Sequence, residues 1–197
     1  MSAFAFFADT YATERLKILS VWSQIPDEQM RFRPEPRART PLEHMVHQCM
    51  SEDAWMKTML GIDVGKAVLP ADERRQAFIA HYADASAARL DVLRQKSDAW
   101  FQEPTQFFDV ARSRAWVLVR RLTHSAHHRG QLTAYIRMWG QPLFSTYGPT
   151  ADTGGLARNG ATVVYPYDSI DDLLAHDGRD GERMLPGTGP APVTERP

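Results

Sequence analysis

Hydrophobic and polar residues follow the spacing of amphipathic helices along most of the chain, and four long segments show this pattern. They cover about residues 3–25, 40–61, 71–101 and 113–139. Polar and charged residues take the opposite face of each segment. Four helices of this length, joined by real connections, can bury their apolar faces around one core. The pattern therefore predicts an all-α fold, a four-helix bundle.

Short sequence signals mark where two of these segments begin and end. Thr40 precedes the second segment, Pro41 takes the first helical position, and Glu43 follows three residues after the cap. This arrangement is typical of a capping box. Gly140 and Pro142 are expected to end the fourth segment.

The composition changes after Pro142, where Gly, Pro, Thr and Asp replace the helical pattern. We therefore expect a bundle domain over residues 1–152 and a loop-rich C-terminal extension over residues 153–197. Within the extension, SIDDLLAHDG predicts one short final helix capped by Ser169, and the closing GTGPAPVTERP is typical of a disordered end. Between the third and fourth segments, TQFFDV indicates a short extended piece.

Charge and composition exclude several classes of protein. The 23 basic and 24 acidic side chains nearly balance, so no global field attracts nucleic acid or an anionic membrane. Asp9 and Glu14 interrupt the amphipathic start, which argues against a signal peptide, and no run of apolar residues is long enough for a membrane span. The single Cys49 cannot form an internal disulfide and is expected to be a small buried residue. We expect a cytoplasmic protein.

The histidines carry the candidate chemistry, because three of the seven fall within LTHSAHHRGQL. His124 and His128 are four residues apart, so a helix projects both from one face, where they can reach one metal ion. His47 is the best candidate for a third ligand, since it lies in the middle of the second segment. If the second and fourth helices are neighbours, these residues form a three-nitrogen site. Such a site is expected to lose its ion as the pH falls through ~6.5.

The remaining histidines are assigned other roles. His44 is interpreted as a surface residue of the first turn, and His127 as an exposed residue or one that lies behind the ligands. Competing metal schemes fit poorly. No Glu stands three residues before a proposed ligand, as a di-iron bundle requires, and Ser125 stands where a zinc protease needs Glu.

Arginines make the fourth segment basic, and two interpretations are open for them. The simpler one is a solvated helix face; the other is a local anion site beside the metal, with Arg129 as its first member. Gln131 either orients a ligand or a loop carbonyl, or packs in the helix core. A DNA-binding bundle that uses the arginine row is disfavoured by the balanced net charge.

The segments TPLEHMVHQCMSEDAW, HSAHHRGQL and GQPLFSTYGPTAD together resemble the DinB/YfiT-like superfamily of metal-binding four-helix bundles, over about residues 1–152. The resemblance implies an up-down-down-up bundle, usually a homodimer. It also implies one divalent ion, zinc or nickel most often and iron in some cases, held by His47, His124 and His128. Characterised relatives include transferases and isomerases that use a low-molecular-weight thiol, and proteins described as metal-dependent hydrolases.

These observations lead to one preferred function and two alternatives. The preferred function is a metal-dependent enzyme that activates a thiol or a water molecule for a small-molecule substrate, with thiol-dependent transfer favoured by the resemblance alone. A hydrolase shares the same activation step. The alternative from another class is a non-catalytic metal-binding stress-response protein.

Overall fold

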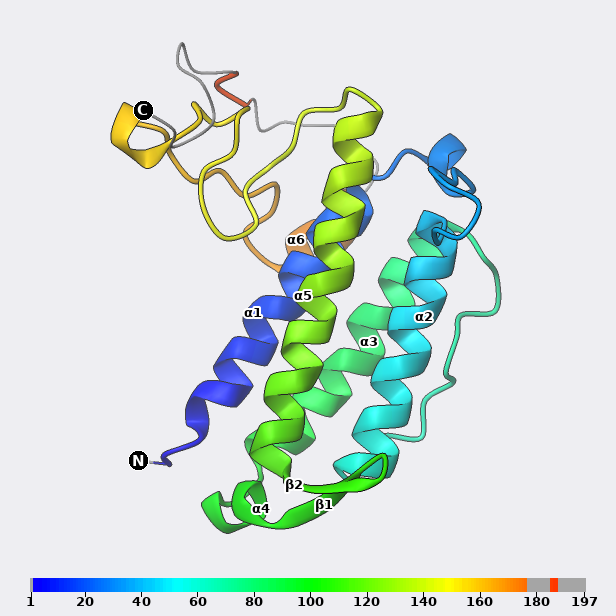
Figure 1. Cartoon of the computed structure of the whole chain (residues 1–197), viewed down its shortest axis with the longest axis vertical. Helices are drawn as coiled ribbons and strands as arrows, with labels where there is room; N and C mark the ends of the chain where they lie inside the picture. The colour runs from blue at the N-terminus through cyan, green and yellow to red at the C-terminus, as the bar shows by residue number, and fades with distance from the viewer. Residues whose placement is uncertain (1, 177–184, 188–197) are drawn as a thin grey trace.

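Four long helices form the body of the protein, as Figure 1 shows in the computed structural model, which describes residues 2–176 and 185–187. Seen along the chain, the first runs up, the next two run down and the last runs up, so the bundle is up-down-down-up. Helix α1 packs against α3 and α5, and α2 packs against the same two helices. The long helices are α1 (Ala5–Ser23), α2 (Pro41–Ala54), α3 (Arg75–Arg94) and α5 (Arg114–Met138).

Capping side chains determine where α2 and α5 begin. The Thr40 hydroxyl accepts a hydrogen bond from the backbone N–H of Glu43 at 3.2 Å, and the Glu43 carboxylate accepts from the N–H of Thr40 at 2.8 Å. The predicted capping box is therefore present. At α5 the Ser113 hydroxyl accepts from the N–H of Trp116 at 3.2 Å. Gly140, at φ 70°, follows the end of α5.

The predicted third helix is wrong in its extent, because it is two helices. Helix α3 ends at Arg94, and the short α4 (Asp98–Gln102) begins after Ser97, whose hydroxyl accepts from the N–H of Trp100 at 3.3 Å. The chain leaves the helical conformation after Arg94, and the Ser97 cap starts a separate helix.

The segment expected to be extended is an antiparallel hairpin of β1 (Pro104–Phe107) and β2 (Val110–Ser113). Strand β1 also contacts η2 (Trp55–Met59), a π-helical turn that continues α2. The hairpin therefore lies beside the end of α2 and the start of α5, at the lower end of the bundle in Figure 1.

A polar layer divides the hydrophobic core of the bundle into two clusters. On each long helix, buried polar or charged residues lie between the members of one apolar cluster and the members of the other. We define the polar layer by these buried residues: Glu14, Arg15, Glu52, Ser86, Arg89, Arg121, Ser125, His128 and Arg129. Charged groups are rarely buried unless they are paired. The four long helices therefore contribute residues that can pair with one another at the same height of the bundle.

The segment that follows α5 folds back onto the bundle. It contains a short turn, η3 (Ala157–Asn159), and the predicted final helix, α6 (Ile170–His176), which packs on α1 and α3. Ser169 caps α6 by accepting from the N–H of Asp172 at 3.0 Å. Leu173 is fully buried in the core cluster. The predicted disordered end lies, from residue 188 onward, outside the described residues. A further 3-10 turn, η1 (Asp27–Gln29), lies in the connection between α1 and α2.

Across residues 2–176 and 185–187, no helix is both long enough and apolar enough to span a membrane.

Candidate metal centre

Three imidazoles from two helices meet at the level of the polar layer. His47 comes from α2, and His124 and His128 come from α5 one turn apart. The Nε2 atom of His124 lies 3.3 Å from Nε2 of His47 and 3.2 Å from Nε2 of His128. One ligand atom from each residue lies within 4.8 Å of the others, so the group could hold a metal ion. The structure thus brings together the three residues expected from the sequence.

The tautomer of His128 suits metal binding. Its Nδ1 atom lies 3.0 Å from the Oε1 atom of Gln131, and an amide oxygen can only accept a hydrogen bond. With the Gln131 amide in this orientation, the contact favours a ring proton on Nδ1, which leaves the Nε2 lone pair available to a metal ion. An outer hydrogen bond of this kind fixes the orientation of a ligating histidine in metalloproteins. A Gln131 side chain that orients a ligand would make this contact with His128.

Burial keeps the three imidazoles neutral, which is the form that binds a metal. Burial and the nearby Arg121 guanidinium lower the pKa of His124 to about 3. Burial lowers the pKa of His128 to about 4, although the Gln131 hydrogen bond acts in the opposite direction. The pKa of His47 is lowered by burial and by the positive charges of Arg39 and Arg121. Protons therefore compete with a metal at a lower pH than for an exposed histidine, and for His124 and His128 well below the ordinary histidine range.

Arg121 joins the histidine group to the rest of the polar layer. Its Nη1 atom lies 2.8 Å from the Ser51 hydroxyl and 3.3 Å from Nδ1 of His124. A guanidinium can only donate, so this longer contact favours a proton on Nε2 of His124 and opposes metal binding, as does the positive charge of Arg121 itself. The shorter bond to Ser51 gives Arg121 a partner that does not compete with the ion.

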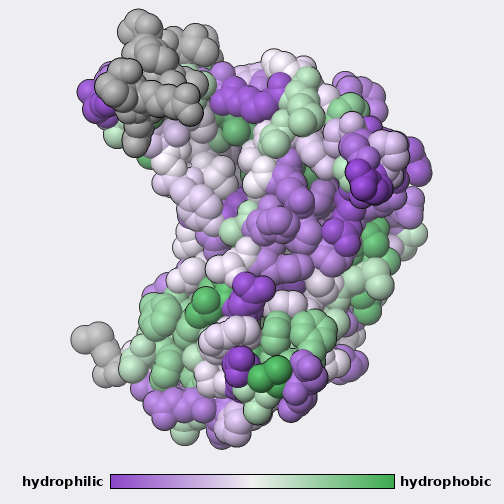
Figure 2. All heavy atoms as spheres, viewed as in Figure 1, coloured by the Kyte–Doolittle hydropathy of each residue, from purple (hydrophilic) through white to green (hydrophobic). Residues whose placement is uncertain are grey.

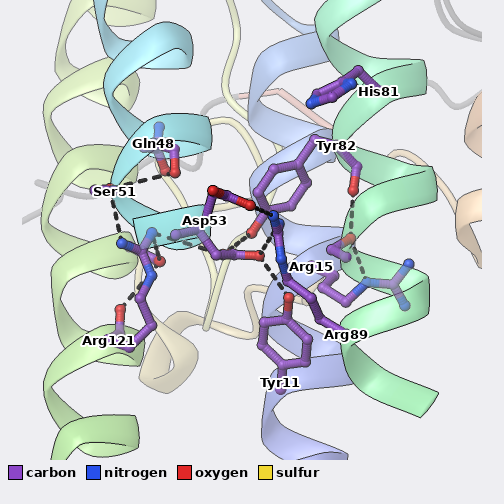
Figure 3. A network of polar contacts seen from close by, with 12 residues as sticks. Tyr11, Arg15, Gln48, Ser51, Asp53, His81, Tyr82, Arg89 and Arg121 are labelled. Atoms are coloured by element: carbon purple, nitrogen blue, oxygen red, sulfur yellow. Dashed lines mark hydrogen bonds and ion pairs between the residues drawn. The ribbon is translucent and has the colours of Figure 1, made fainter. Parts of the chain in front are cut away.

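Glu52 is the centre of a buried polar network, and Figure 3 shows several of its partners, among them Tyr11, Tyr82 and Arg121. Its carboxylate accepts hydrogen bonds from the hydroxyls of Tyr11 at 2.6 Å and Tyr82 at 2.7 Å. It also pairs with Arg89 at 3.3 Å and Arg121 at 3.7 Å. Burial and the Glu52 charge raise the pKa of both tyrosines, so their hydroxyls stay protonated and donate.

Sequence reasoning missed this network, although the sequence contains a signal for it. Glu52 lies seven residues after Met45 and four before Met56, which places it on the core face of α2. Arg121 lies in the same way between the core positions of Leu118 and Ser125 on α5. A charged residue at a helix position otherwise reserved for the core indicates a buried ion pair.

The structure corrects the interpretation of His44. It was expected at the surface, but it is 1% exposed and its ring centre lies 5.3 Å from that of His128. Burial, followed by the charge of His128, lowers the pKa of His44 to about 3. His44 can occupy the inner face of α2 because its neighbour His128 belongs to the polar layer. His127 is exposed, and the single Cys49 is buried, as expected.

The solvated-face interpretation is right for the exposed Arg120 and wrong for Arg121 and Arg129, which are 1% and 2% exposed. Arg129 forms an ion pair of 2.7 Å with Glu14 and a hydrogen bond with the hydroxyl of Tyr147. Its guanidinium is therefore already matched by a carboxylate. The contact ties the loop after α5 to α1.

The fold and the histidine group together define a helical-bundle protein with a group able to hold a metal ion. The model of the DinB family matches residues 1–155, and the chain belongs to the DinB family.

Two solved structures share the fold. One is a DinB-like protein from Bacillus cereus ATCC 10987, with a TM-score of 0.62 and 18% identity, covering 72% of this chain and 95% of that one. The other is the DinB-like protein YjoA from Bacillus subtilis, with a TM-score of 0.57 and 12% identity, covering 72% and 96%. No protein with a curated description matches the chain.

Proposed function

We propose that this protein is a metal-dependent enzyme whose ion is held by His47, His124 and His128. The observation that carries the proposal is the convergence of three Nε2 atoms from two helices, with His124 3.3 Å and 3.2 Å from the others. Zinc or nickel is the expected ion, and iron is also compatible, since imidazole suits all three. A homodimer in the cytoplasm is expected from the family resemblance and from the single buried cysteine.

The residues of the histidine group and their neighbours have different roles in the proposed site. The three neutral imidazoles supply ligands without adding negative charge, and Gln131 keeps His128 in the ligating tautomer. A divalent ion bound there supplies Lewis acidity, which lowers the pKa of a thiol or a water molecule. Trp55, whose ring centre lies 5.4 Å from that of His124, gives the group an aromatic neighbour.

Thiol-dependent transfer to a small-molecule acceptor is our preferred reaction, because family resemblance favours a low-molecular-weight thiol as the activated group. Hydrolysis would use the same centre. A non-catalytic metal-binding stress-response protein is the alternative from another class. Within the described residues the group has no fourth His, Cys, Asp or Glu. A catalytic site keeps one position open, whereas a structural site is closed by protein ligands, so this observation supports the enzyme.

The first experiment measures the metal content of the purified full-length protein and of three variants. His124→Ala and His128→Ala are expected to lose the ion, and the exposed His127→Ala is the matched control that keeps it. Equal loss in all three variants would refute the assignment of ligands.

The second experiment screens small thiols, each with an electrophilic acceptor, for product formation by the metal-loaded protein. Turnover that disappears in His124→Ala supports thiol transfer. If no thiol is consumed but an ester or amide substrate is cleaved, the result supports hydrolysis instead of thiol transfer. Stoichiometric metal with neither activity would favour the non-catalytic alternative.

A further inference from the structure

An aromatic strip leads from the histidine group to the surface. It consists of Trp55, Phe107, Phe108 and Trp116. The ring centre of Trp55 lies 5.4 Å from that of His124 and 5.2 Å from that of Phe107. Phe107 in turn lies 4.8 Å from Phe108 and 5.0 Å from Trp116. Each ring thus contacts the next, and the row extends from the candidate ligands to the tip of the hairpin.

The outer end of the strip is exposed in a way that folding alone does not explain. Phe108 is 67% exposed and, at φ 52°, is the one non-glycine residue with positive φ in the described part of the chain. A bulky side chain is unfavourable in that conformation, where Asn or Gly is common. Val110 and Trp116, beside it, are 39% and 37% exposed. Figure 2 shows apolar side chains gathered at this lower end of the molecule. An exposed apolar patch beside a polar site indicates a binding surface.

Two guanidiniums give the strip its charge. The Cζ atoms of Arg112 and Arg120 lie over the ring of Trp116, at 5.2 Å and 6.0 Å from its centre. Neither arginine has an ion-pair partner among the residues that the structure describes. Asp109 at the hairpin turn is the one acidic residue of residues 104–113. A divalent ion held by neutral imidazoles would add positive charge at the inner end of the strip, so both ends suit an anion.

The spacing of residues along α5 indicates how long a ligand must be to reach both ends of the strip. Trp116, Arg120 and His124 follow one another at intervals of four residues, so they lie along one side of the helix. At ~1.5 Å per residue, Trp116 and His124 are about 12 Å apart along the helix axis. A molecule of about two fused rings with a charged substituent can therefore touch both the histidine group and the arginines.

We propose that the aromatic strip, with Arg112 and Arg120 at its far end, binds the substrate, and that this substrate is an organic anion with a flat apolar group. The inference rests on the proposed function, because the reacting end of the substrate would reach the histidine group. The planes of Trp55, Phe107 and Phe108 are nearly perpendicular to one another, so the flat group stacks on one of these rings and meets the edges of the others. Its anionic substituent pairs with the two guanidiniums.

The test uses 2-naphthalenesulfonate, a flat anion whose sulfonate is a poor ligand for divalent ions, and its uncharged analogue 2-naphthylmethanol. Calorimetric titration of the full-length protein, with zinc and after chelation, gives both affinities. The sulfonate is expected to bind about fivefold more tightly than the alcohol. The double substitution Arg112→Gln with Arg120→Gln should abolish this preference and leave the alcohol unaffected.

Phe108→Asn should weaken both ligands by about threefold to tenfold, because it removes one aromatic contact. Asparagine tolerates positive φ, so the turn is expected to fold normally. The matched control is Phe6→Gln, which removes an aromatic residue that is 54% exposed on α1 and should change neither affinity.

Three results would overturn the inference: equal affinity of Phe108→Asn and Phe6→Gln, an unchanged preference for the sulfonate in the double arginine variant, or loss of self-association in Phe108→Asn with unaltered ligand affinity. The last result would assign the strip to a second copy of the chain. Zinc binding without binding of the naphthalene compounds refutes this inference alone. Their binding to a protein that takes up no zinc refutes the proposed function alone.

Discussion

The Glu52→Gln substitution tests whether charge holds the polar layer together. Glutamine has nearly the same shape, so the change removes the negative charge and replaces one of the two accepting oxygens by an NH2 group. Arg89 keeps an ion pair of 2.9 Å with Asp53. Arg121, at 1% exposure, has no other ion-paired carboxylate within the described residues. The substitution therefore leaves one buried guanidinium without a counter-charge.

The expected loss of stability follows from this unpaired charge. Removing one partner of a buried ion pair costs about 3–5 kcal/mol of unfolding free energy. The side-chain amide that the substitution introduces can still bond one tyrosine hydroxyl, and Ser51 and Ser125 still accept from Arg121, so we expect the lower limit, ~3 kcal/mol. For a chain of this size such a loss lowers the melting temperature by about 6–12 °C.

Circular dichroism during thermal and urea unfolding measures both quantities. The matched control is Glu73→Gln, which breaks an exposed pair with Arg31 at 3.5 Å and should cost less than ~0.5 kcal/mol. A loss below ~1 kcal/mol for Glu52→Gln would refute the view that the carboxylate is needed to neutralise Arg121.

The remaining predictions concern the ligands and the cap. Gln131→Leu should lower the zinc affinity by about 10- to 100-fold, measured against a chromophoric chelator, because His128 loses the bond that fixes its tautomer; an unchanged affinity contradicts this. Zinc affinity should decline at a lower pH than in an exposed three-histidine site, since the pKa of His47 is lowered, that of His128 is lowered to about 4 and that of His124 to about 3; a full decline already near pH 6.5 would show that the imidazoles are not desolvated. Without metal, the unfolding free energy should decrease as the pH falls from ~6.5 toward these folded-state pKa values, because the unfolded histidines take up protons first. Thr40→Ala should cost about 1 kcal/mol on thermal unfolding, and no cost would mean that the capping box is redundant.

The pH prediction differs from the expectation drawn from the sequence, and the reason is tertiary. An exposed three-histidine site would release its ion as the pH falls through ~6.5. Here the bundle withdraws the rings from solvent and places Arg121 beside His124. Both effects favour the neutral imidazole, so the ion should be released at a lower pH than from an exposed site.

Much of the fold could be predicted because it depends on local patterns. The spacing of apolar residues located the long helices, and Thr40, Glu43 and Gly140 marked ends that the structure confirms. The break between α3 and α4 escaped prediction because Ser97 is compatible with both the inside and the start of a helix. Helical propensity is a weak guide where one polar residue decides the path of the chain.

By itself the sequence determined the helices and the spacing of His124 and His128, because these depend on neighbours within one or two turns. Only the tertiary structure decided that His47 meets them and that His44 is buried. It also decided that Glu52 pairs with Arg121 and that the hairpin places Phe107 against Trp55. Each of these contacts joins residues from different elements, and the packing of the bundle alone sets the distance between them.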